Sequence, residues 1–234
     1  MKTVIVVPTY NEKENMGLLM KEIFSIVPDI SVLIVDDSSP DGTGEEVKKL
    51  QTVYPRLFLL TRAVKDGLGN AYKAGFKKVI QDWPDTEVVM MMDADFTHEP
   101  SKIPALLAGL SDVDMVIGSC HKDPAGMKDY PWHRALLGKW SNIYCRTILG
   151  YPLTDWTNAF VAIRMSHLKN IDFANLDGNE FAFIFEFRYA LLKNGARWKE
   201  IFTPAMPRRA GESKMQFSTI WESVRLPWKL RFKK

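Results

Sequence analysis

The 234-residue chain lacks the features that mark several whole classes of protein. It has two cysteines, Cys120 and Cys145, which fit neither a disulfide framework nor the spacing of a metal site, so we expect a reducing compartment. No apolar run approaches the roughly 18 to 20 residues that span a bilayer, and the run at the N-terminus breaks at Pro8 without a cleavage-like site. The formal net charge of +3 is too small to favour nucleic acid as a partner. We therefore expect a cytoplasmic chain without a transmembrane segment.

Two phosphate-binding motifs are also missing. There is no G-x-x-x-x-G-K-[ST] loop, and no G-x-G-x-x-G follows the first apolar run, so ATP hydrolysis and dinucleotide redox chemistry are poorly supported. The stretch "DGLGNAYKAG", residues 66–75, does place glycines before a helical pattern. Its backbone N–H groups could bind a diphosphate, or the glycines could simply allow a tight loop.

Strands and helices alternate through the first half of the chain. β-Branched and apolar runs predict strands at 3–7, 31–37, 57–61, 87–93 and 114–119, with two more at 159–164 and 199–204. Helices are predicted from Asn11, with Glu14 completing a capping box, from the turn at 40–47, and over 69–81. Gly195 should end the helix before the last strand. The pattern predicts an α/β fold with a mostly parallel central sheet flanked by helices on both faces.

Polar clusters follow three of the predicted strands at their carboxyl ends, where such sheets bind ligands. They are "PTYNE" at 8–12, Asp36-Asp37, and Asp93-Ala94-Asp95. Two carboxylates one residue apart can hold Mg²⁺ or Mn²⁺, and a cation bound in this way usually also binds a phosphate-bearing substrate. A lone D-x-D is a weak signal, and a solvated helix-capping pair is the alternative. The buried strand before it and the other two clusters favour the metal site.

Six segments together resemble the family 2 glycosyltransferases, and most closely the dolichol- and polyprenyl-phosphate mannose synthases. They are "VVPTYNEKEN", "VDDSSPDGT", "GLGNAYKAGF", "MDADFTHEP", "VIGS" and "RRAGESK", in the family's order over roughly residues 3–215. The resemblance implies the GT-A (Rossmann-like) fold. We expect one domain over 1–215, with a nucleotide-binding half (1–119) and an acceptor half (120–215), and a basic aromatic C-terminal segment over 216–234.

The resemblance also implies roles for individual residues. Asp93 and Asp95 would bind the metal, Mg²⁺ or Mn²⁺, and Ala94 would lie with them beside the diphosphate. Arg134 would contact the acceptor phosphate. Pro8, Tyr10 and Glu12 would line the nucleotide-base pocket, and Val35 and Asp37 would close on the base and ribose. A basic loop that closes over the diphosphate would contain Arg208, Ser213 and Lys214. The implied catalytic residues are Asp95, Arg134, Arg208 and Lys214.

The activity implied is inverting, metal-dependent transfer of a sugar, mannose from GDP-mannose before others, to a polyprenyl or dolichyl phosphate. A phosphate acceptor is largely dianionic at neutral pH and needs no general base, in keeping with a sequence that offers none. The alternatives are a UDP-sugar donor such as UDP-glucose, a different acceptor, or a non-catalytic nucleotide-sugar-binding subunit. The chain is expected to act peripherally at the cytoplasmic face of a membrane or with a membrane-embedded partner.

Some positions depart from the family or allow two interpretations. Cys120 stands where an arginine usually follows "GS" in the family. One interpretation is that His121 or Lys122 supplies the missing positive charge. The other is that this chain uses a different donor or acceptor. "DWTNAF" has Asn158-Ala159 where a small residue and glycine are usual.

Other residues admit a structural interpretation beside a functional one. Glu186 matches an acidic family position but could equally form a buried ion pair with Arg188 or Arg164. Asp36 is expected to cap a turn, and His98, His121 and His133 show no spacing of a metal site or triad. The end of the chain is either a membrane-surface segment or a packed helix, and Pro227 disfavours one continuous helix.

Overall fold

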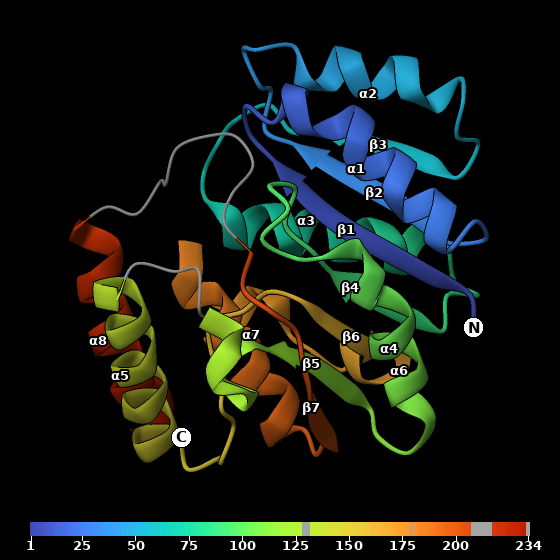
Figure 1. Ribbon diagram of the computed structural model, residues 1–234. Coiled ribbons are helices and arrows are strands. Elements are labelled where there is room, and N and C mark those ends of the chain that lie inside the picture. The colour runs from blue at the N-terminus through green and yellow to red at the C-terminus, as the bar shows by residue number, and fades with distance from the viewer. Residues whose placement is uncertain (128–131, 179, 207–216, 233–234) are drawn as a thin grey trace.

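The computed structural model describes residues 1–127, 132–178, 180–206 and 217–232 (Figure 1). The strands are β1 (Thr3–Thr9), β2 (Ser31–Asp36), β3 (Leu57–Thr61), β4 (Val88–Met91), β5 (Met115–Ser119), β6 (Val161–Arg164) and β7 (Trp198–Phe202). The α-helices are α1 (Lys13–Ile26), α2 (Thr43–Gln51), α3 (Leu68–Asp82), α4 (Ile103–Ala108), α5 (Trp132–Leu149), α6 (Met165–Leu168), α7 (Glu180–Lys193) and α8 (Phe217–Phe232).

The strands form one seven-stranded sheet in the order β3-β2-β1-β4-β6-β5-β7. β6 runs antiparallel to both β4 and β5, and every other neighbouring pair is parallel. The predicted mostly parallel sheet is therefore confirmed, and each predicted strand lies within two residues of its position. Because β6 is antiparallel to both its neighbours, β5 points the same way as β4. The carboxyl ends of β1, β2, β4 and β5 thus lie at one edge of the sheet.

Helices cover both faces of the sheet because successive strand residues point to opposite sides. Val4 and Val6 of β1 face a core that contains α3 and α7, whereas Ile5 and Val7 face a core that contains α1, α2 and α4. Both sets are almost completely buried. Strands buried on both faces explain the continuous apolar runs in the sequence.

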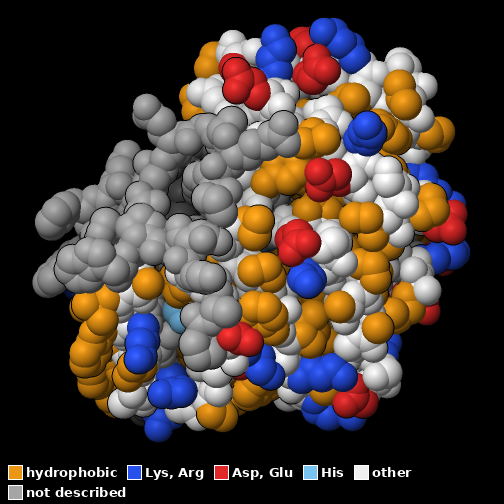
Figure 2. All heavy atoms as spheres, viewed as in Figure 1, with side chains coloured by type: hydrophobic (Ala, Val, Ile, Leu, Met, Phe, Trp, Pro, Cys, Tyr) orange, Lys and Arg blue, Asp and Glu red, His pale blue; other side chains and the backbone are white. Residues whose placement is uncertain are grey.

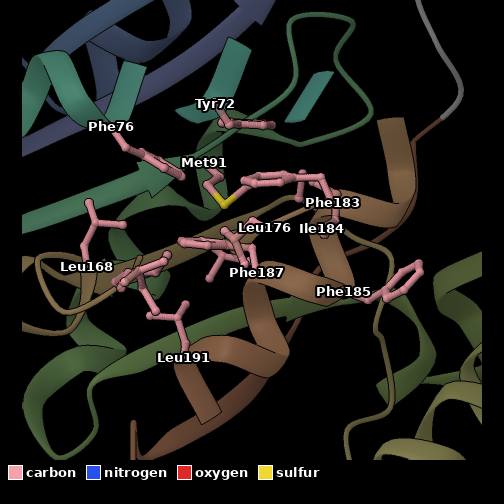
Figure 3. Close-up of a cluster of buried hydrophobic side chains, with 14 of the residues drawn as sticks. Tyr72, Phe76, Met91, Leu168, Leu176, Phe183, Ile184, Phe185, Phe187 and Leu191 are labelled. Carbon is pink, nitrogen blue, oxygen red and sulfur yellow. The ribbon is translucent and has the colours of Figure 1, made fainter. Parts of the chain in front are cut away.

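The helix pair α3–α7 forms an aromatic layer under the sheet (Figure 3). Phe183 of α7 stacks on Tyr72 of α3 with ring centroids 6.1 Å apart, and Phe187 stacks on Phe76 at 5.1 Å. α7 is apolar nearly all round, as expected of a helix enclosed by other elements. Tyr72 also reaches the edge of the sheet where the polar clusters lie, so this layer supports the site from below.

Two helix predictions need correction. α1 begins at Lys13 rather than Asn11, and the predicted capping box is wrong: Asn11 is left-handed (φ 58°) and its N–H donates to Ser39 Oγ. α8 continues through Pro227, which is buried, although Pro227 disfavoured one continuous helix in the sequence. The helix end predicted at Gly195 is confirmed, with Gly195 left-handed (φ 79°) after α7.

Candidate functional site

Left-handed backbone marks the sheet edge at the candidate site. The non-glycine residues with positive φ in the described chain are Asn11 (58°), Ser38 (51°) and Phe96 (65°). They follow β1, β2 and β4 respectively, each within five residues of the strand end. Such conformations are costly for side chains with a Cβ and are concentrated at ligand sites. Here they turn the chain sharply at the strand ends that carry the polar clusters.

Asp36 organises the loop that follows β2. Its Oδ1 accepts hydrogen bonds from Thr9 Oγ1 at 3.0 Å and Ser39 Oγ at 2.5 Å, and its Oδ2 accepts the Ser39 N–H at 3.0 Å. The structural role predicted for Asp36 is confirmed. This carboxylate ties the end of β1 to the loop after β2.

Asp37 has a different environment from Asp36. Its side chain is 7% exposed and pairs with Arg62, Nη1 to Oδ1, at 2.8 Å, while Arg62 also pairs with Asp66. Burial raises the pKa of the Asp37 carboxyl to about 6, against the opposing effect of the Arg62 charge. Asp37 is therefore a carboxylate at the sheet edge whose ionisation changes just below neutral pH.

The predicted base-pocket residues lie beside this acidic pair. Pro8 of β1 is in register with Val35 of β2, so the two are neighbours at the sheet edge. Lys65 Nζ lies 4.0 Å from the centroid of the Tyr10 ring. Glu12 is buried, and its Oε2 accepts a hydrogen bond from Asn15 Nδ2 at 2.8 Å. The structure thus brings Pro8, Val35 and Asp37 together at one edge.

The Asp93–Asp95 loop follows β4. Asp95 is 3% exposed, and its Oδ1 accepts the N–H of Thr97 at 3.0 Å and the Thr97 hydroxyl at 2.6 Å. The side chain of Asp93 is 31% exposed, and its backbone N–H donates to His98 Nδ1 at 2.9 Å. These contacts orient the Asp95 carboxylate and anchor the backbone of Asp93 at the end of a buried strand.

His98 is a site residue that the sequence did not indicate. Since Nδ1 accepts a hydrogen bond, the ring proton of the neutral imidazole lies on Nε2, which is 3.8 Å from Asp93 Oδ2. The ring stacks on Phe160 at 5.0 Å between centroids. His98 therefore links the Asp93 loop to the segment before β6. Its only signal in the sequence is its place five residues after Asp93.

Tyr72 connects the aromatic layer to the same loop. Its hydroxyl lies 3.4 Å from both the Met92 carbonyl oxygen and Asp93 Oδ1. Burial, and then the negative charge of Asp93, raise the pKa of Tyr72 well above its usual value. Tyr72 is therefore a neutral hydrogen-bond donor toward Asp93.

The carboxylates Asp93 and Asp95 suit a hard divalent cation in their chemistry. Mg²⁺ and Mn²⁺ prefer oxygen ligands, and a strand end with two oriented carboxylates supplies them. Thr97 donates two hydrogen bonds to Asp95, one from its N–H and one from its hydroxyl, and so holds this carboxylate in place. The donor set thus fits the predicted cation.

The loop before β6, residues 154–160, lies on the other side of the candidate site. Glu200 of β7 accepts the N–H groups of Thr154 and Asp155 on Oε1 at 2.8 and 3.0 Å. The guanidinium of Arg188, which is 1% exposed, donates to the carbonyl oxygens of Asp155 and Asn158. Desolvation lowers the pKa of Arg188 to about 10, and the carboxylates of Asp155 and Glu200 oppose this shift.

The ion pair considered for Glu186 is wrong for both arginines. Within the described residues, Arg188 and Arg164 donate to backbone carbonyl oxygens, and neither pairs with Glu186. Glu186 is 1% exposed and accepts the Gly178 N–H at 2.5 Å. The carboxylate thus closes the loop before α7.

Cys120 lies in the short 3₁₀ turn Cys120–Lys122 after β5, at the same edge as Asp93 and Asp95. Lys122 Nζ donates to the Glu200 carbonyl oxygen at 2.8 Å, so that cation is engaged in the fold. Cys120 and His121 instead line a cavity of about 400 Å³ between this turn and α5. Contrary to the expectation from spacing, Cys120, His121 and Asp155 also form a cluster of metal-ligating side chains.

Several predicted site residues cannot be placed. Arg208, Ser213 and Lys214 lie outside the described residues, and the side chains of His133 and Arg134 in α5 are not described. Their predicted roles rest on the sequence resemblance. Along the described chain, no helix is long and apolar enough to cross a membrane.

The fold of the chain is similar to the folds of two solved enzyme structures. Glucosyl-3-phosphoglycerate synthase from Mycobacterium tuberculosis, in complex with Mn²⁺, UDP and phosphoglyceric acid, matches 99% of this chain and 78% of its own at a TM-score of 0.67 and 14% identity. A mannosyltransferase from Pyrobaculum calidifontis, in complex with GDP-Man and Mn²⁺, matches 98% of this chain and 72% of its own, at a TM-score of 0.58 and 18% identity. The sheet and its flanking helices therefore have the GT-A fold, as predicted.

Sequence comparison identifies the family. Residues 4–172 match the model of glycosyl transferase family 2. The undecaprenyl-phosphate mannosyltransferase of Micrococcus luteus is 35% identical over 96% of this chain and 91% of its own. The polyprenol monophosphomannose synthase of Mycolicibacterium smegmatis is 34% identical over 95% and 84%. The chain belongs to glycosyl transferase family 2, and the resemblance inferred from its motifs is confirmed.

Proposed function

We propose that the chain transfers a mannosyl group from GDP-mannose to a polyprenyl phosphate, with inversion at the anomeric carbon. The observation that carries this proposal is the oriented Asp93–Asp95 pair at the same sheet edge as Pro8, Val35 and Asp37. The names of the relatives at 34–35% identity support the mannosyl group and the lipid acceptor. The GDP-Man complex of the Pyrobaculum structure supports the donor.

In this proposal the described residues bind and orient the donor. Pro8, Tyr10 and Glu12 line the base pocket, and Val35 and Asp37 close on the base and ribose. Asp93 and Asp95 hold Mg²⁺ or Mn²⁺, with Ala94 between them beside the diphosphate. A cation held by Asp93 and Asp95 would stabilise the negative charge that develops on the leaving nucleoside diphosphate. Thr97 and Tyr72 keep the two carboxylates oriented through the hydrogen bonds described above.

The acceptor half needs no general base. A phosphate monoester is largely dianionic at neutral pH and attacks the anomeric carbon directly. From the sequence resemblance, Arg134 would contact that phosphate, and Arg208, Ser213 and Lys214 would bind the donor diphosphate through charge-assisted hydrogen bonds. A single displacement of this kind inverts the anomeric configuration.

A transfer assay with matched donors tests the proposal. We expect product from GDP-mannose and polyprenyl phosphate in the presence of Mn²⁺ or Mg²⁺, and much less from UDP-glucose. Chelation of the metal should stop transfer. If product forms only with UDP-glucose, the donor is a UDP-sugar rather than GDP-mannose. If product forms only with a non-lipid acceptor, the acceptor is not a polyprenyl phosphate. Binding of the nucleotide sugar without any transfer would favour a non-catalytic subunit.

We further propose that α5 and α8 rest on a membrane surface while the donor site faces the aqueous phase. The two helices pack together, with Tyr144 Oη donating to the Val224 carbonyl oxygen at 2.7 Å. Leu226 and Leu230 of α8 are buried, yet Val224, Trp228 and Phe232 form a second apolar stripe four residues apart that is exposed. α8 is therefore apolar on its outward side as well as on its packed side.

The exposed stripe of α8 has a counterpart on α5. Leu136, Leu137 and Trp140 are 47%, 53% and 63% exposed on one side of that helix. In Figure 2 hydrophobic side chains gather at the lower left, where Figure 1 draws α5 and α8, with blue Lys and Arg side chains beside them. Exposed aromatic and aliphatic groups flanked by cations suit an anionic lipid surface.

Vesicle sedimentation tests the membrane contact. The chain should bind vesicles that contain anionic lipid, and a Trp140→Asp/Trp228→Asp variant should lose most of that binding. Val53→Asp/Val64→Asp is the matched control, because both valines are exposed elsewhere in the molecule. Equal binding by the tryptophan variant and the control would contradict the proposal, as would equal binding to neutral vesicles.

A further inference from the structure

A second cluster of metal-ligating side chains lies apart from Asp93 and Asp95. Ligand atoms of Cys120, His121 and Asp155 all lie within 4.8 Å of one another. Cys120 and Asp155 are buried, at 8% and 1% exposed, and His121 is partly exposed. The sequence does not reveal this cluster, because Asp155 is 35 residues from Cys120 and is brought near it by the loop before β6.

The cluster is held rigidly by its surroundings. Asp155 Oδ1 accepts the N–H groups of Thr157 and Asn158 at 3.1 Å each, which leaves Oδ2 directed at Cys120 Sγ, 3.6 Å away. The His121 N–H donates to Ser119 Oγ at 3.2 Å, and its ring lies against Gly138 of α5. Two ligands of a tetrahedral zinc ion, one sulfur at about 2.3 Å and one oxygen at about 2.0 Å, lie roughly 3.5 Å apart. The observed separation matches that value.

The charges nearby also fit a divalent cation. Arg188 and Glu200 bring one positive and one negative charge to this loop, so they balance each other. A Cys120 thiolate and the Asp155 carboxylate would together balance two positive charges.

The cluster opens onto the cavity of about 400 Å³ between the Cys120 turn and α5. Asn142 lines that cavity, is 4% exposed, and its Nδ2 has no hydrogen-bond partner among the described residues, while its Oδ1 accepts the Trp156 N–H at 2.6 Å. A buried amide donor without a partner is costly and indicates a missing acceptor. Lys139 and Arg146 also line the cavity. Water or an anionic group in the cavity could accept a hydrogen bond from Asn142 Nδ2 and lie near the positive charge of Lys139 or Arg146.

We propose that Cys120, His121 and Asp155 bind a zinc-like divalent transition metal, with an open coordination position toward this cavity. Three protein ligands with one open position are typical of zinc sites that also bind water or a ligand. Thiolate and imidazole ligands favour such metals over Mg²⁺, whereas Asp93 and Asp95 offer only oxygen. The two sites therefore select different metals.

Cobalt spectroscopy on reduced, metal-free protein tests the site. Co²⁺ bound by a thiolate gives a sulfur-to-metal charge-transfer band and the intense visible bands of a tetrahedral ion. We expect both in the Asp95→Asn protein, whose strand-end site is disabled, and displacement of the bands by Zn²⁺ but not by a large excess of Mg²⁺. Cys120→Ser should abolish the charge-transfer band, whereas Cys145→Ser, which replaces the other buried cysteine, should keep it.

The Asp155→Asn variant tests the site independently, in case the Cys120→Ser variant does not fold. Asparagine can accept the same two loop N–H groups on Oδ1, so the loop should remain folded by circular dichroism while the visible bands weaken or shift. No thiolate band in the parent protein, or a band that survives Cys120→Ser, would overturn the proposal and leave Cys120 as a hydrogen-bond donor to Asp155. Neither measurement uses a nucleotide sugar, so their failure would not affect the proposed transfer reaction.

Discussion

The two sides of the sheet edge are built differently. On the donor side, Asp36, Asp37 and Asp95 each receive hydrogen bonds or an ion pair from neighbouring side chains. On the acceptor side, a cavity of about 400 Å³ remains beside Cys120, and the amide nitrogen of Asn142 has no partner within the described chain. Apolar side chains are also exposed on α5 and α8. The carboxylates on the proposed donor side are thus held in place by the fold itself, whereas the proposed acceptor side has an open cavity and exposed apolar helices, which suit a larger, amphipathic ligand.

The largest effect is expected at Asp95 on the proposed donor side. Asp95→Ala should lower transfer by about 10²–10³-fold, the usual cost of removing one electrostatic contact to a developing charge. The measurement is initial rate with saturating donor, with circular dichroism to verify the fold. Asp85→Ala is the control, because Asp85 forms an exposed ion pair with Lys2 at 3.1 Å and should have near-normal activity. Near-normal turnover of Asp95→Ala with metal present would contradict the proposed site.

The next largest effect is expected on stability, at the contact between α3 and α7. A Cβ on Gly69 of α3 would lie 2.8 Å from the Gly178 carbonyl oxygen and from Phe183 Cβ. Gly69→Ala should therefore destabilise the chain by about 1–3 kcal/mol through overpacking. A Cβ on Gly17 of α1 meets nothing within 4 Å, so Gly17→Ala should stabilise it by about 0.5–1 kcal/mol. Urea unfolding of both variants measures the difference, and two changes of the same sign would argue against the α3–α7 contact.

On the acceptor side, Glu200→Gln should loosen the loop that precedes β6. The carboxylate of Glu200 accepts the Thr154 hydroxyl at 2.9 Å and two backbone N–H groups, and an amide cannot accept them all. A loss of about 1–3 kcal/mol is expected for hydrogen bonds to a buried charged group. Glu14→Gln, at an exposed position, should change stability by less than about 0.5 kcal/mol. Equal effects in urea unfolding would show that Glu200 does not hold the loop.

The smallest predicted effect concerns Asp37 on the donor side. Burial raises its pKa to about 6 in the folded chain, whereas an unfolded aspartate titrates near about pH 4. Its contribution to stability is thus fully present below about pH 4 and is lost as the pH rises through about 6. Asp37→Asn carries no charge and still accepts from Arg62, so its Tm should gain on the parent by a few degrees between those values. A Tm difference that does not change with pH would contradict this assignment.

The sequence predicted the sheet well because burial on both faces leaves continuous apolar runs. It also placed Asp93, Asp95 and Asp37 at one edge, since parallel strands end there together. His98 could not be predicted, because its contact with Asp93 depends on the left-handed turn at Phe96. The Cys120–Asp155 contact depends on an antiparallel β6 between β4 and β5, which local patterns do not show. The continuity of α8 through Pro227 depends likewise on packing against the body.

The central claim is that Asp93 and Asp95 hold a divalent cation that is shared with the diphosphate of the donor. The most direct measurement is a thermal-shift titration with GDP and Mn²⁺, separately and together, on the parent and on Asp95→Asn. A ligand that binds the folded state raises the Tm. We predict that GDP and Mn²⁺ together raise the Tm of the parent by more than the sum of their separate effects, and that this excess disappears in Asp95→Asn. The same stabilisation by GDP without metal, or an undiminished excess in Asp95→Asn, would contradict the claim.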